Sequence, residues 1–394
     1  MRTQVAIVGA GPAGLLLAHL LHRAGIDSVV VEIRSREHVE HRVRAGVLEQ
    51  GTVDLLDDCG LAGRMRREGL VHHGIELRFS GRGHRIDLTG LTGRSITVYG
   101  QQELVKDLIV ARVATGRPVH FDAREVAIEG FDGDRPRVTF EASGRPEAID
   151  CDFVAGCDGF HGVCRASLAD GAFAVHERTY PFAWLGILAE APPSREELVY
   201  SSHERGFALF SMRSPALTRL YLQVEPEERT EAWSDDRTWS ELAARFEATD
   251  GWRPNEGRIV AKSVTGMRSF VAEPMRHGRL FLAGDAAHIV PPTGAKGLNL
   301  ALADVRVLAR ALVRWYARGD ASRLDAYSAT CLRRVWRAEH FSWWMTAMLH
   351  RFHGEGSFHR KLQLAQLEYV VSSRAAATSL AENYVGLAWE EPAD

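Results

Sequence analysis

The sequence has few cysteines, no cysteine pair at a metal-binding spacing and no excess of either charge. Its five cysteines are Cys59, Cys151, Cys157, Cys164 and Cys331. Neither a CxxC motif nor a cysteine–histidine spacing connects them, so we expect reduced thiols and no bound metal. The 48 Lys and Arg against 51 Asp and Glu give a net charge of −3. Nucleic acid and anionic membrane surfaces are therefore not expected as partners.

Long apolar runs are also missing. The longest, such as residues 15–18, fall far short of the ~18 residues that span a bilayer. Residues 1–4 lead directly into an apolar strand, without the apolar stretch of a secretory signal, and we expect a cytoplasmic protein. Of the 394 residues, 45% are hydrophobic and 25% are charged. This composition is typical of a globular protein, and at ~150 residues per domain the length predicts about two to three domains.

The first thirty residues predict a strand, a helix and a second strand. Residues 4–8 are a β-branched run typical of a buried strand, and residues 15–24 have the apolar spacing of a helix. Residues 29–32 are the second strand. This order indicates a parallel βαβ unit.

Glycine is abundant, and three glycines follow the first strand in the spacing GxGxxG: Gly9, Gly11 and Gly14. In a dinucleotide site the first allows a tight turn, the second admits a pyrophosphate and the third lets the helix pack on the strand. Glu32, at the end of the second strand, is placed to accept hydrogen bonds from ribose hydroxyls. The pattern in this context predicts nucleotide binding.

Two later apolar strands also end in an aspartate. The runs 153–156 and 279–283 are followed by Asp158 and Asp285. Both carboxylates should reach the carboxyl edge of the sheet, where open α/β sheets bind ligands. A glycine-rich loop at 291–297 then opens a helix, whose first amides can bind a phosphate or an electron-rich ring.

The remaining segments predict a second, antiparallel layer and a helical end. We expect helices at 47–56, 104–114 and 239–247, strands at 119–126, 137–141, 184–189, 197–201, 207–211 and 219–224, and final helices at 298–316, 325–349 and 360–380. The change to short alternating strands near residue 180 indicates a second domain.

Together these motifs resemble the group A FAD-dependent aromatic hydroxylases. The resemblance covers residues 1 to about 388, and its most specific blocks are 44–51, 157–162, 277–301, 341–346 and 381–386. The chain departs from many members at Gly162, where they carry a serine. The resemblance implies an α/β fold with a Rossmann-like FAD-binding domain, a mixed antiparallel-sheet substrate domain and C-terminal helices.

The resemblance also implies how the domains divide the chain. The FAD-binding domain would comprise 1–72, 98–178 and 268–345, the substrate-binding domain 73–97 and 179–267, and the C-terminal helical region 346–394. The family further suggests a homodimer.

The resemblance gives cofactor roles to individual residues. Glu32 would hold the FAD ribose, Arg44 would lie near the pyrophosphate, and Gln101 would contact the adenosine half. Asp285 would bind the flavin side chain. The full set of expected FAD contacts is Gly9, Gly11, Gly14, Glu32, Arg42, Val43, Arg44, Ala45, Gly46, Val47, Gln101, Asp158, Asp285, Gly297, Leu298 and Asn299.

A small aromatic acid needs an anchor for its carboxylate, and a guanidinium offers a planar fork. The resemblance gives this role to Arg213, with Ser211 two residues earlier on the same strand face. Tyr221 would contact the same carboxylate. Met212 is expected to line the pocket and tune which aromatic acid fits.

The resemblance also implies a proton relay. Tyr200 would bind the phenolate of the substrate, Tyr384 would be its relay neighbour, and His72 would accept the proton on the solvent side. Lys296 would add positive potential near the flavin, and the carbonyl of Pro292 would contact the substrate hydroxyl.

The expected activity is hydroxylation of 4-hydroxybenzoate beside its hydroxyl, giving 3,4-dihydroxybenzoate. FAD reduced by NAD(P)H would activate O2 as a C4a-hydroperoxide in this family. A phenol of pKa ~10 must lose its proton near pH 7, and three pKa units correspond to ~4 kcal/mol. Hydrogen bonds to the phenolate and nearby positive charge can supply part of this.

Three alternatives stay open. Arginines at 34, 36 and 42 favour the 2′-phosphate of NADPH and glutamates at 37 and 40 oppose it, so NADPH and NADH both remain candidates. Another aromatic acid, such as 3-hydroxybenzoate or 3,4-dihydroxybenzoate, would fit the same motifs. A flavin-binding protein that senses or carries without hydroxylating is the alternative from another class.

Overall fold

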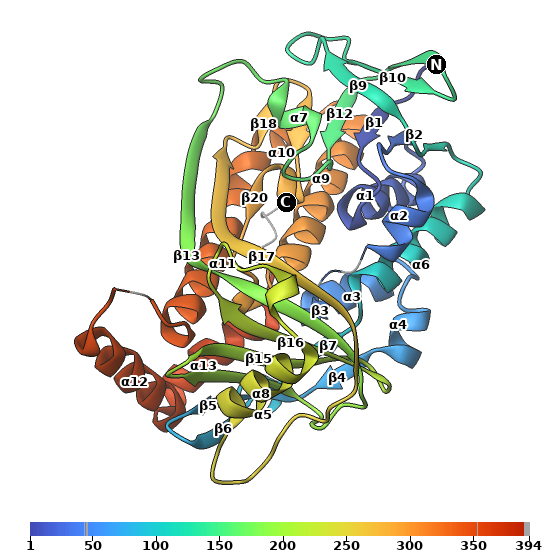
Figure 1. The fold of residues 1–394 in the computed structure, drawn as a ribbon. Helices are drawn as coiled ribbons and strands as arrows, with labels where there is room; N and C mark the ends of the chain where they lie inside the picture. The colour runs from blue at the N-terminus through green and yellow to red at the C-terminus, as the bar shows by residue number, and fades with distance from the viewer. Residues whose placement is uncertain (43, 45, 353, 390–394) are drawn as a thin grey trace.

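The computed structural model describes residues 1–42, 44, 46–352 and 354–389, and its first layer is a six-stranded sheet of order β18-β19-β12-β1-β2-β8 (Figure 1). The strands β1 (Val5–Val8), β2 (Ser28–Val31) and β12 (Phe153–Gly156) are parallel neighbours and are buried along their whole length. Short apolar runs suit strands that helices cover on both faces. The sheet is completed by β8 (Val119–His120), β18 (Arg276–His277) and β19 (Leu280–Leu282).

Helices cover this sheet. The helices α1 (Pro12–Arg23), α6 (Gln101–Ala114) and α9 (Gly297–Arg318) pack around the buried strands, and α1 contacts both of the others. The α/β fold class expected from the sequence is confirmed. Among the described residues, no helix is both long enough and apolar enough to cross a membrane.

The second layer is an eight-stranded sheet of order β20-β17-β13-β16-β15-β14-β5-β6. Its strands are β5 (Gly74–Phe79), β6 (Arg82–Asp87), β13 (Ala174–Glu190), β14 (Leu198–His203), β15 (Gly206–Ser214), β16 (Leu217–Val224), β17 (Arg258–Glu273) and β20 (His288–Ile289). All neighbours are antiparallel except β5 and β14. The long strands β13 and β17 are neighbours in this sheet and extend from it towards the first sheet (Figure 1).

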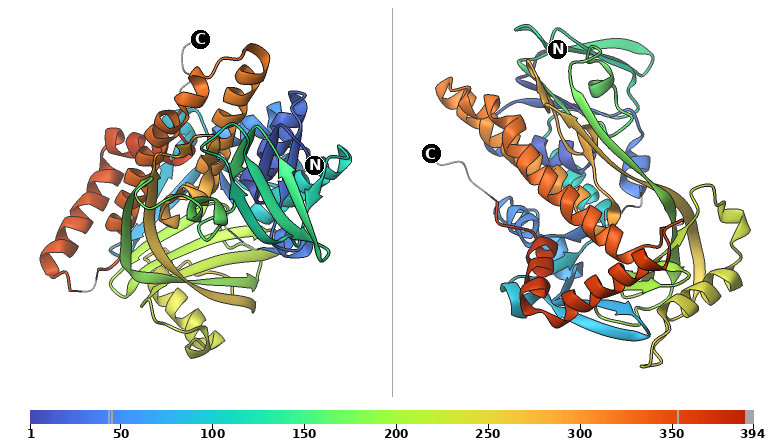
Figure 2. Two further views of the ribbon diagram at one scale, coloured as in Figure 1. Left: turned by 90° about the horizontal axis from the view of Figure 1, so that it is seen from above. Right: turned by 90° about the vertical axis from the view of Figure 1, so that its left-hand side faces the viewer.

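Helices cover both faces of the antiparallel sheet. One face packs against α8 (Asp235–Phe246). The other face packs against α11 (Tyr327–Leu349), α12 (Ser357–Ser372) and α13 (Arg374–Val385). Figures 1 and 2 show α12 and α13, in red, at the same end of the molecule as this sheet.

The remaining elements include two three-stranded sheets, of order β11-β10-β9 and β3-β7-β4. In chain order, these elements are α2 (Arg36–His41), β3 (Val47–Leu48), α3 (Gln50–Asp58), α4 (Gly63–Glu68), β4 (Leu70–His72), α5 (Leu88–Thr92), β7 (Ile96–Val98), β9 (Arg124–Glu129), β10 (Arg137–Ala142), β11 (Arg145–Asp150), α7 (Val163–Ala166), α10 (Ser322–Asp325) and the 3-10 turns Thr230–Ala232, Gly284–Ala286 and Pro292–Gly294.

Some predicted boundaries are wrong. The single strand expected at 119–126 is two strands in different sheets, because Asp122 has a left-handed φ of 56° and turns the chain between them. The helix expected at 360–380 is broken at Ser373, whose extended backbone ends α12 and whose hydroxyl accepts a hydrogen bond from the Ala376 amide at the start of α13. The helix expected at 47–56 begins only at Gln50.

Candidate active site

The turn between β1 and α1 uses its three glycines differently. A Cβ atom at Gly9, whose φ is +107°, would lie 2.3 Å from the carbonyl oxygen of Cys157, and a Cβ at Gly14 would lie 2.0 Å from the carbonyl oxygen of Gly9. A Cβ at Gly11 would meet no described atom within 4 Å. Close backbone packing therefore requires two of the glycines. Gly11, the remaining glycine, leaves open space at the N-terminus of α1, where the helix dipole attracts a phosphate.

Glu32 is fixed beside this turn. Its Oε2 accepts a hydrogen bond of 2.7 Å from the Ala10 amide and its Oε1 accepts one of 2.8 Å from the Arg34 amide. Each carboxylate oxygen has a further lone pair, so the buried side chain can still accept hydrogen bonds from a ribose.

Charged side chains gather at the same carboxyl edge. Asp285 follows β19 and is exposed. Burial and the neighbouring Arg44 lower the pKa of Arg42, while Asp285 and Glu32 raise it. These four groups are therefore close enough to interact, and their guanidinium groups suit a diphosphate. Val43 and Ala45, also expected to contact FAD, lie outside the described residues.

The position of Asp158 explains why a glycine occupies position 162, where many of the hydroxylases that the sequence resembles carry a serine. The Oδ2 of Asp158 accepts a hydrogen bond of 2.8 Å from the Cys164 amide at the start of α7. A Cβ at Gly162 would lie 2.1 Å from the Asp158 Cγ, so a serine there would displace this carboxylate. The Asp158 Oδ1 is buried and has no hydrogen-bond partner in the described part of the chain.

The start of α9 is joined to the segment around β3. The Oδ1 of Asn299 accepts hydrogen bonds from the Glu49 amide (2.9 Å) and the Thr52 hydroxyl (2.8 Å), and its Nδ2 donates to the Val47 carbonyl (2.9 Å). The side chain of Asn299 is thus fully used in structure. The backbone of residues 297–299, including half-buried Gly297 and Leu298, forms the first turn of α9.

Other expected FAD contacts lie between these elements. Gln101 is the first residue of α6 and is half-buried. A Cβ at Gly46 would lie 2.1 Å from the Tyr99 carbonyl oxygen, so this position also needs a glycine. Val47 lies in β3 and packs against the apolar cluster under the antiparallel sheet. It connects the cofactor edge with that sheet.

Two tyrosines 184 positions apart meet in this cluster. The hydroxyls of Tyr200 on β14 and Tyr384 on α13 are 2.5 Å apart, and the Tyr200 hydroxyl also donates to the carbonyl of Thr293 at 3.3 Å. Burial raises the pKa of both phenols. The pair forms a continuous hydrogen-bonded chain, and both side chains are buried.

A positive patch lies on the same sheet. Leu209 and Ser211 alternate with residues of β15 that pack under α8, so they lie on the opposite face. Arg213 lies where the register of β15 shifts, and it interacts with Tyr221 on that same face. Leu209 pairs with Tyr221 on β16. Burial alone would raise the pKa of Tyr221, but Arg213 and Arg219 lower it below the ordinary value. Because the Arg213 Nε has no partner among the described residues, it can bind a carboxylate.

A family model described as FAD binding domain matches residues 2–342. The chain belongs to this FAD-binding family. This flavoprotein is 51% identical to the p-hydroxybenzoate hydroxylase of Acinetobacter baylyi over 391 residues. The aligned region covers 99% of this chain and 96% of that protein. It is 31% identical over 332 residues to a 12-dehydrotetracycline 5-monooxygenase/anhydrotetracycline 6-monooxygenase of Streptomyces rimosus, over 77% of this chain and 61% of that protein.

Solved structures share the fold of this flavoprotein. The p-nitrophenol 4-monooxygenase of Pseudomonas putida superposes with a TM-score of 0.81 at 18% identity, covering 98% of this chain and 99% of that one. The open space at Gly11, the fixed Glu32 and the paired charges at the carboxyl edge all fit FAD.

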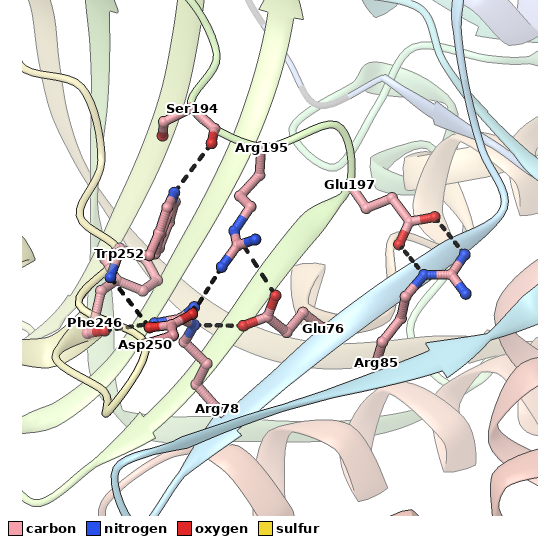
Figure 3. A network of polar contacts seen from close by, with 9 residues as sticks. All are labelled: Glu76, Arg78, Arg85, Ser194, Arg195, Glu197, Phe246, Asp250 and Trp252. Atoms are coloured by element: carbon pink, nitrogen blue, oxygen red, sulfur yellow. Dashed lines mark hydrogen bonds and ion pairs between the residues drawn. The ribbon is translucent and has the colours of Figure 1, made fainter.

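His72 lies elsewhere than expected in this flavoprotein. It is on β4 with 1% of its surface exposed, so the expected solvent-side position is wrong. Burial lowers its pKa to about 4, while Glu197 acts in the opposite direction. Neither ring nitrogen has a hydrogen-bond partner in the described ranges, so no direct bond joins it to Tyr384. Figure 3 shows Glu197 held by two 2.8 Å hydrogen bonds from Arg85.

The prediction for Met212 is also wrong. Its side chain is 1% exposed and packs with α8 on the opposite face of the sheet from Ser211 and Arg213. The face with the tyrosine pair instead carries Leu209 and, on β13, Trp184. The period of two along β15 was a signal that could have selected Leu209, because it shares its parity with Ser211.

Lys296 does not act as an isolated charge. Its Nζ lies 2.8 Å from the Glu49 Oε1, donates to the Tyr384 carbonyl at 3.1 Å and also donates to the Asn383 carbonyl. Burial lowers its pKa, and Glu49 opposes this shift. Sequence reasoning did not pair Lys296 with Glu49, because 247 positions separate them.

The loop before α9 contains a backbone carbonyl, that of Pro292, that can accept a second hydrogen bond. The carbonyl of Pro292 accepts a hydrogen bond of 3.0 Å from the Ala295 amide and retains a second lone pair. No group of three or more histidine, cysteine or acidic residues suited to a metal occurs in the part of the chain that the structure describes.

Proposed function

We propose that this flavoprotein is a monooxygenase that hydroxylates 4-hydroxybenzoate beside its hydroxyl. The substrate, NAD(P)H, a proton and O2 would give 3,4-dihydroxybenzoate, NAD(P)+ and water. The observation that carries the proposal is the shared sheet face of Arg213 and Tyr200, which offers a cation for a carboxylate and a hydroxyl for a phenol. The whole-length similarity to a p-hydroxybenzoate hydroxylase supports it.

The spacing of the two groups supports a substrate with a carboxylate and a hydroxyl at opposite ends of a ring. Tyr200 pairs with Leu209 across β14 and β15. Arg213 lies four residues further along β15, at most about 13 Å at ~3.3 Å per residue, since the strand is irregular between Met212 and Ser214. The two long side chains and one small aromatic acid can fill this span, with Ser211 and Tyr221 beside the carboxylate. The Pro292 carbonyl would accept from the substrate hydroxyl.

Bound FAD would supply the oxygen-activating chemistry. The chain would supply binding, orientation and proton movement. The Tyr200 hydroxyl would take the proton of the substrate hydroxyl as it passes its own proton to the Tyr384 hydroxyl 2.5 Å away, and would then donate a hydrogen bond to the substrate phenolate. Buried His72 would accept it through an intervening water, since no direct contact joins the two residues. The covered position of these groups would exclude bulk water.

The cofactor would rest on the residues at the carboxyl edge. We propose the set expected from the sequence as FAD contacts, with Lys296 adding positive charge that Glu49 partly offsets. We also propose the domain division at 1–72, 98–178 and 268–345, at 73–97 and 179–267, and at 346–394. We propose a homodimer because the family resemblance suggests one, and sedimentation velocity of the holoenzyme would test it.

Anaerobic flavin reduction tests the function. The holoenzyme is mixed with NADPH or NADH, with and without 4-hydroxybenzoate, and oxygen is then admitted and the product identified. We expect reduction to accelerate with the substrate, and 3,4-dihydroxybenzoate to form after oxygen is added. Product from 3-hydroxybenzoate or 3,4-dihydroxybenzoate alone would favour another aromatic acid. Flavin that is bound but not reduced faster with any of the acids would favour a carrier or sensor.

A further inference from the structure

His350 lies at the end of α11 within a stack of aromatic rings. Its side chain is completely buried. The imidazole is nearly parallel to the ring of Phe182, with centroids 4.7 Å apart, and lies 4.2 Å from the ring of Phe207. Its Nε2 is 2.7 Å from the indole Nε1 of Trp184, and its Nδ1 is 3.1 Å from the carbonyl oxygen of Thr346.

These partners fix the protonation state of the imidazole. An indole N–H can only donate, so the Nε2 of His350 must be the acceptor. The proton is therefore on Nδ1, which donates to the carbonyl of Thr346. Burial lowers the pKa of His350 to about 3, so this neutral tautomer persists at neutral pH.

Trp184 connects this histidine with the positive patch. Its indole packs against Phe207 at 5.2 Å and against the ring of Tyr221 at 4.9 Å. It also belongs to the buried cluster that contains Tyr200. One edge of the indole thus faces His350 and one face lies beside Tyr221.

The end of α11 is held independently of this hydrogen bond. The Nε2 of Gln223 donates to the carbonyl of Arg351 at 2.6 Å, and the amide of Arg351 donates to the Oε1 of Gln223 at 2.9 Å. Gln363 donates to the His350 carbonyl at 2.7 Å. Changes at the imidazole should therefore act on Trp184 rather than unfold the helix end.

We propose that His350 is a positioning residue for the substrate pocket. By accepting the indole N–H it fixes the plane of Trp184, which forms the wall beside Tyr221 at the carboxylate end of the substrate. The inference deepens the proposed function and rests on it. By this inference His350, at the end of a helix outside the sheet, contributes to the affinity for small aromatic acids.

Substitutions at both ends of the hydrogen bond test the proposal. His350→Leu removes the acceptor, His350→Gln retains an acceptor and a donor, and Trp184→Phe removes the donor. A buried donor left without its partner costs about 1–3 kcal/mol, which is roughly 5- to 100-fold in an equilibrium. We expect His350→Leu to weaken 4-hydroxybenzoate binding to the holoenzyme about tenfold, and His350→Gln less than about threefold, as measured by flavin absorbance.

A spectroscopic readout separates positioning from general damage. The indole ¹⁵N–H resonance of Trp184, identified by its loss in Trp184→Phe, should be protected from exchange in the wild type and in His350→Gln, and unprotected in His350→Leu. In the Trp184→Phe background the leucine substitution should weaken binding by less than about twofold, since the donor is gone.

The outcomes distinguish the two proposals. A wild-type holoenzyme that binds no 4-hydroxybenzoate rejects the proposed function, whereas equal affinity of the wild type and His350→Leu overturns the role of His350. If His350→Leu does not fold, Trp184→Phe decides, because wild-type affinity in that variant also overturns the role.

Discussion

At the scale of single residues, Glu339 is a buried carboxyl with an unusual titration. It lies on α11 with 5% of its surface exposed, and its Oε1 has no hydrogen-bond partner within the described residues. Burial raises its pKa from 4.5 to about 7, although Ser269 and His288 act in the opposite direction. A carboxyl with a raised pKa favours the fold while it is neutral. This contribution is complete below the unfolded pKa and is lost as pH rises through about 7.

Glu339→Gln should therefore stabilise the protein in a pH-dependent way. We expect the free energy of unfolding to rise by about 2–3 kcal/mol at pH 8 and by less than about 1 kcal/mol at pH 5. Urea unfolding of the holoenzyme at both pH values measures this. Glu382→Gln, at an exposed position of α13, is the control and should change neither value. An equal gain at both pH values would contradict the assigned pKa.

Tyr200→Phe tests the proposed relay at one oxygen atom. The loss of one neutral hydrogen bond costs about 1 kcal/mol, so 4-hydroxybenzoate should bind within about fivefold of the wild type. Without the hydroxyl the phenolate is not formed efficiently, and we expect H2O2 in place of most of the product. The ratio of 3,4-dihydroxybenzoate to NADPH consumed is the measurement. Tyr369→Phe, at an exposed position of α12, should stay coupled, and full coupling in Tyr200→Phe would remove it from the relay.

At the scale of elements, the glycines of the first turn make a sharp prediction. Gly14→Ala should prevent folding, because its Cβ would lie 2.0 Å from a backbone carbonyl. Gly11→Ala meets open space, so the apoprotein should keep its melting temperature. Its affinity for FAD should fall by at least about tenfold if a pyrophosphate occupies that space. Equilibrium dialysis with FAD measures this, and unchanged affinity would move the pyrophosphate elsewhere.

An ionic network surrounds the buried guanidinium of Arg78 near the edge of the antiparallel sheet (Figure 3). Arg78 on β5 is 2% exposed and pairs with Glu76 (2.5 Å) and Asp250 (2.6 Å), and its guanidinium lies over the ring of Trp252. Arg195 also binds Asp250, at 2.8 Å. The network therefore fastens the loop before β14, the strand that carries Tyr200, to the edge strands.

Arg78→Met should destabilise the protein by about 1–3 kcal/mol, because it leaves the buried carbonyl of Phe246 and the half-buried carboxylate of Glu76 without their hydrogen-bond donor. Arg258→Met breaks an exposed pair with Glu190 and should cost less than about 1 kcal/mol. Chemical unfolding of the two variants measures the difference. Equal costs would mean that the contacts of buried Arg78 add little to stability.

The sequence predicted most elements but not which sheet or face each residue joins. Periodicity located the buried strands, yet it could not show that 119–126 divides at Asp122 between two sheets. The expectation that Met212 lines the pocket left strand alternation out of account, because the period of two along β15 turns that side chain towards α8. Such errors arise because local patterns define an element and tertiary packing defines its orientation.

At the scale of the whole molecule, the candidate site joins segments that no local pattern connects. The cofactor edge was predictable because strand ends of a parallel sheet converge. The contacts of Tyr200 with Tyr384 and of Lys296 with Glu49 were not, since they span 184 and 247 positions. Only the family resemblance indicated the tyrosine pair. The burial of His72 depends on β4 pairing with β7, which the sequence did not indicate.

FAD should stabilise the whole chain by mass action. At a free concentration 100 times its Kd, a ligand that binds only the folded state adds about 2.7 kcal/mol. We expect the melting temperature of the apoprotein to rise with the logarithm of FAD concentration. Differential scanning fluorimetry, with a dye whose emission does not overlap that of the flavin, measures this shift. Riboflavin is the control because it lacks the pyrophosphate. An equal shift with riboflavin would argue against the phosphate contacts.

The helix α13 supplies Tyr384 and the carbonyl groups that bind Lys296, whereas every proposed FAD contact lies before residue 300. During synthesis, the nascent polypeptide would have all of its flavin ligands long before α13 leaves the ribosome. A product of premature termination in α12 would thus retain the means to hold a reactive cofactor and lose the means to direct it.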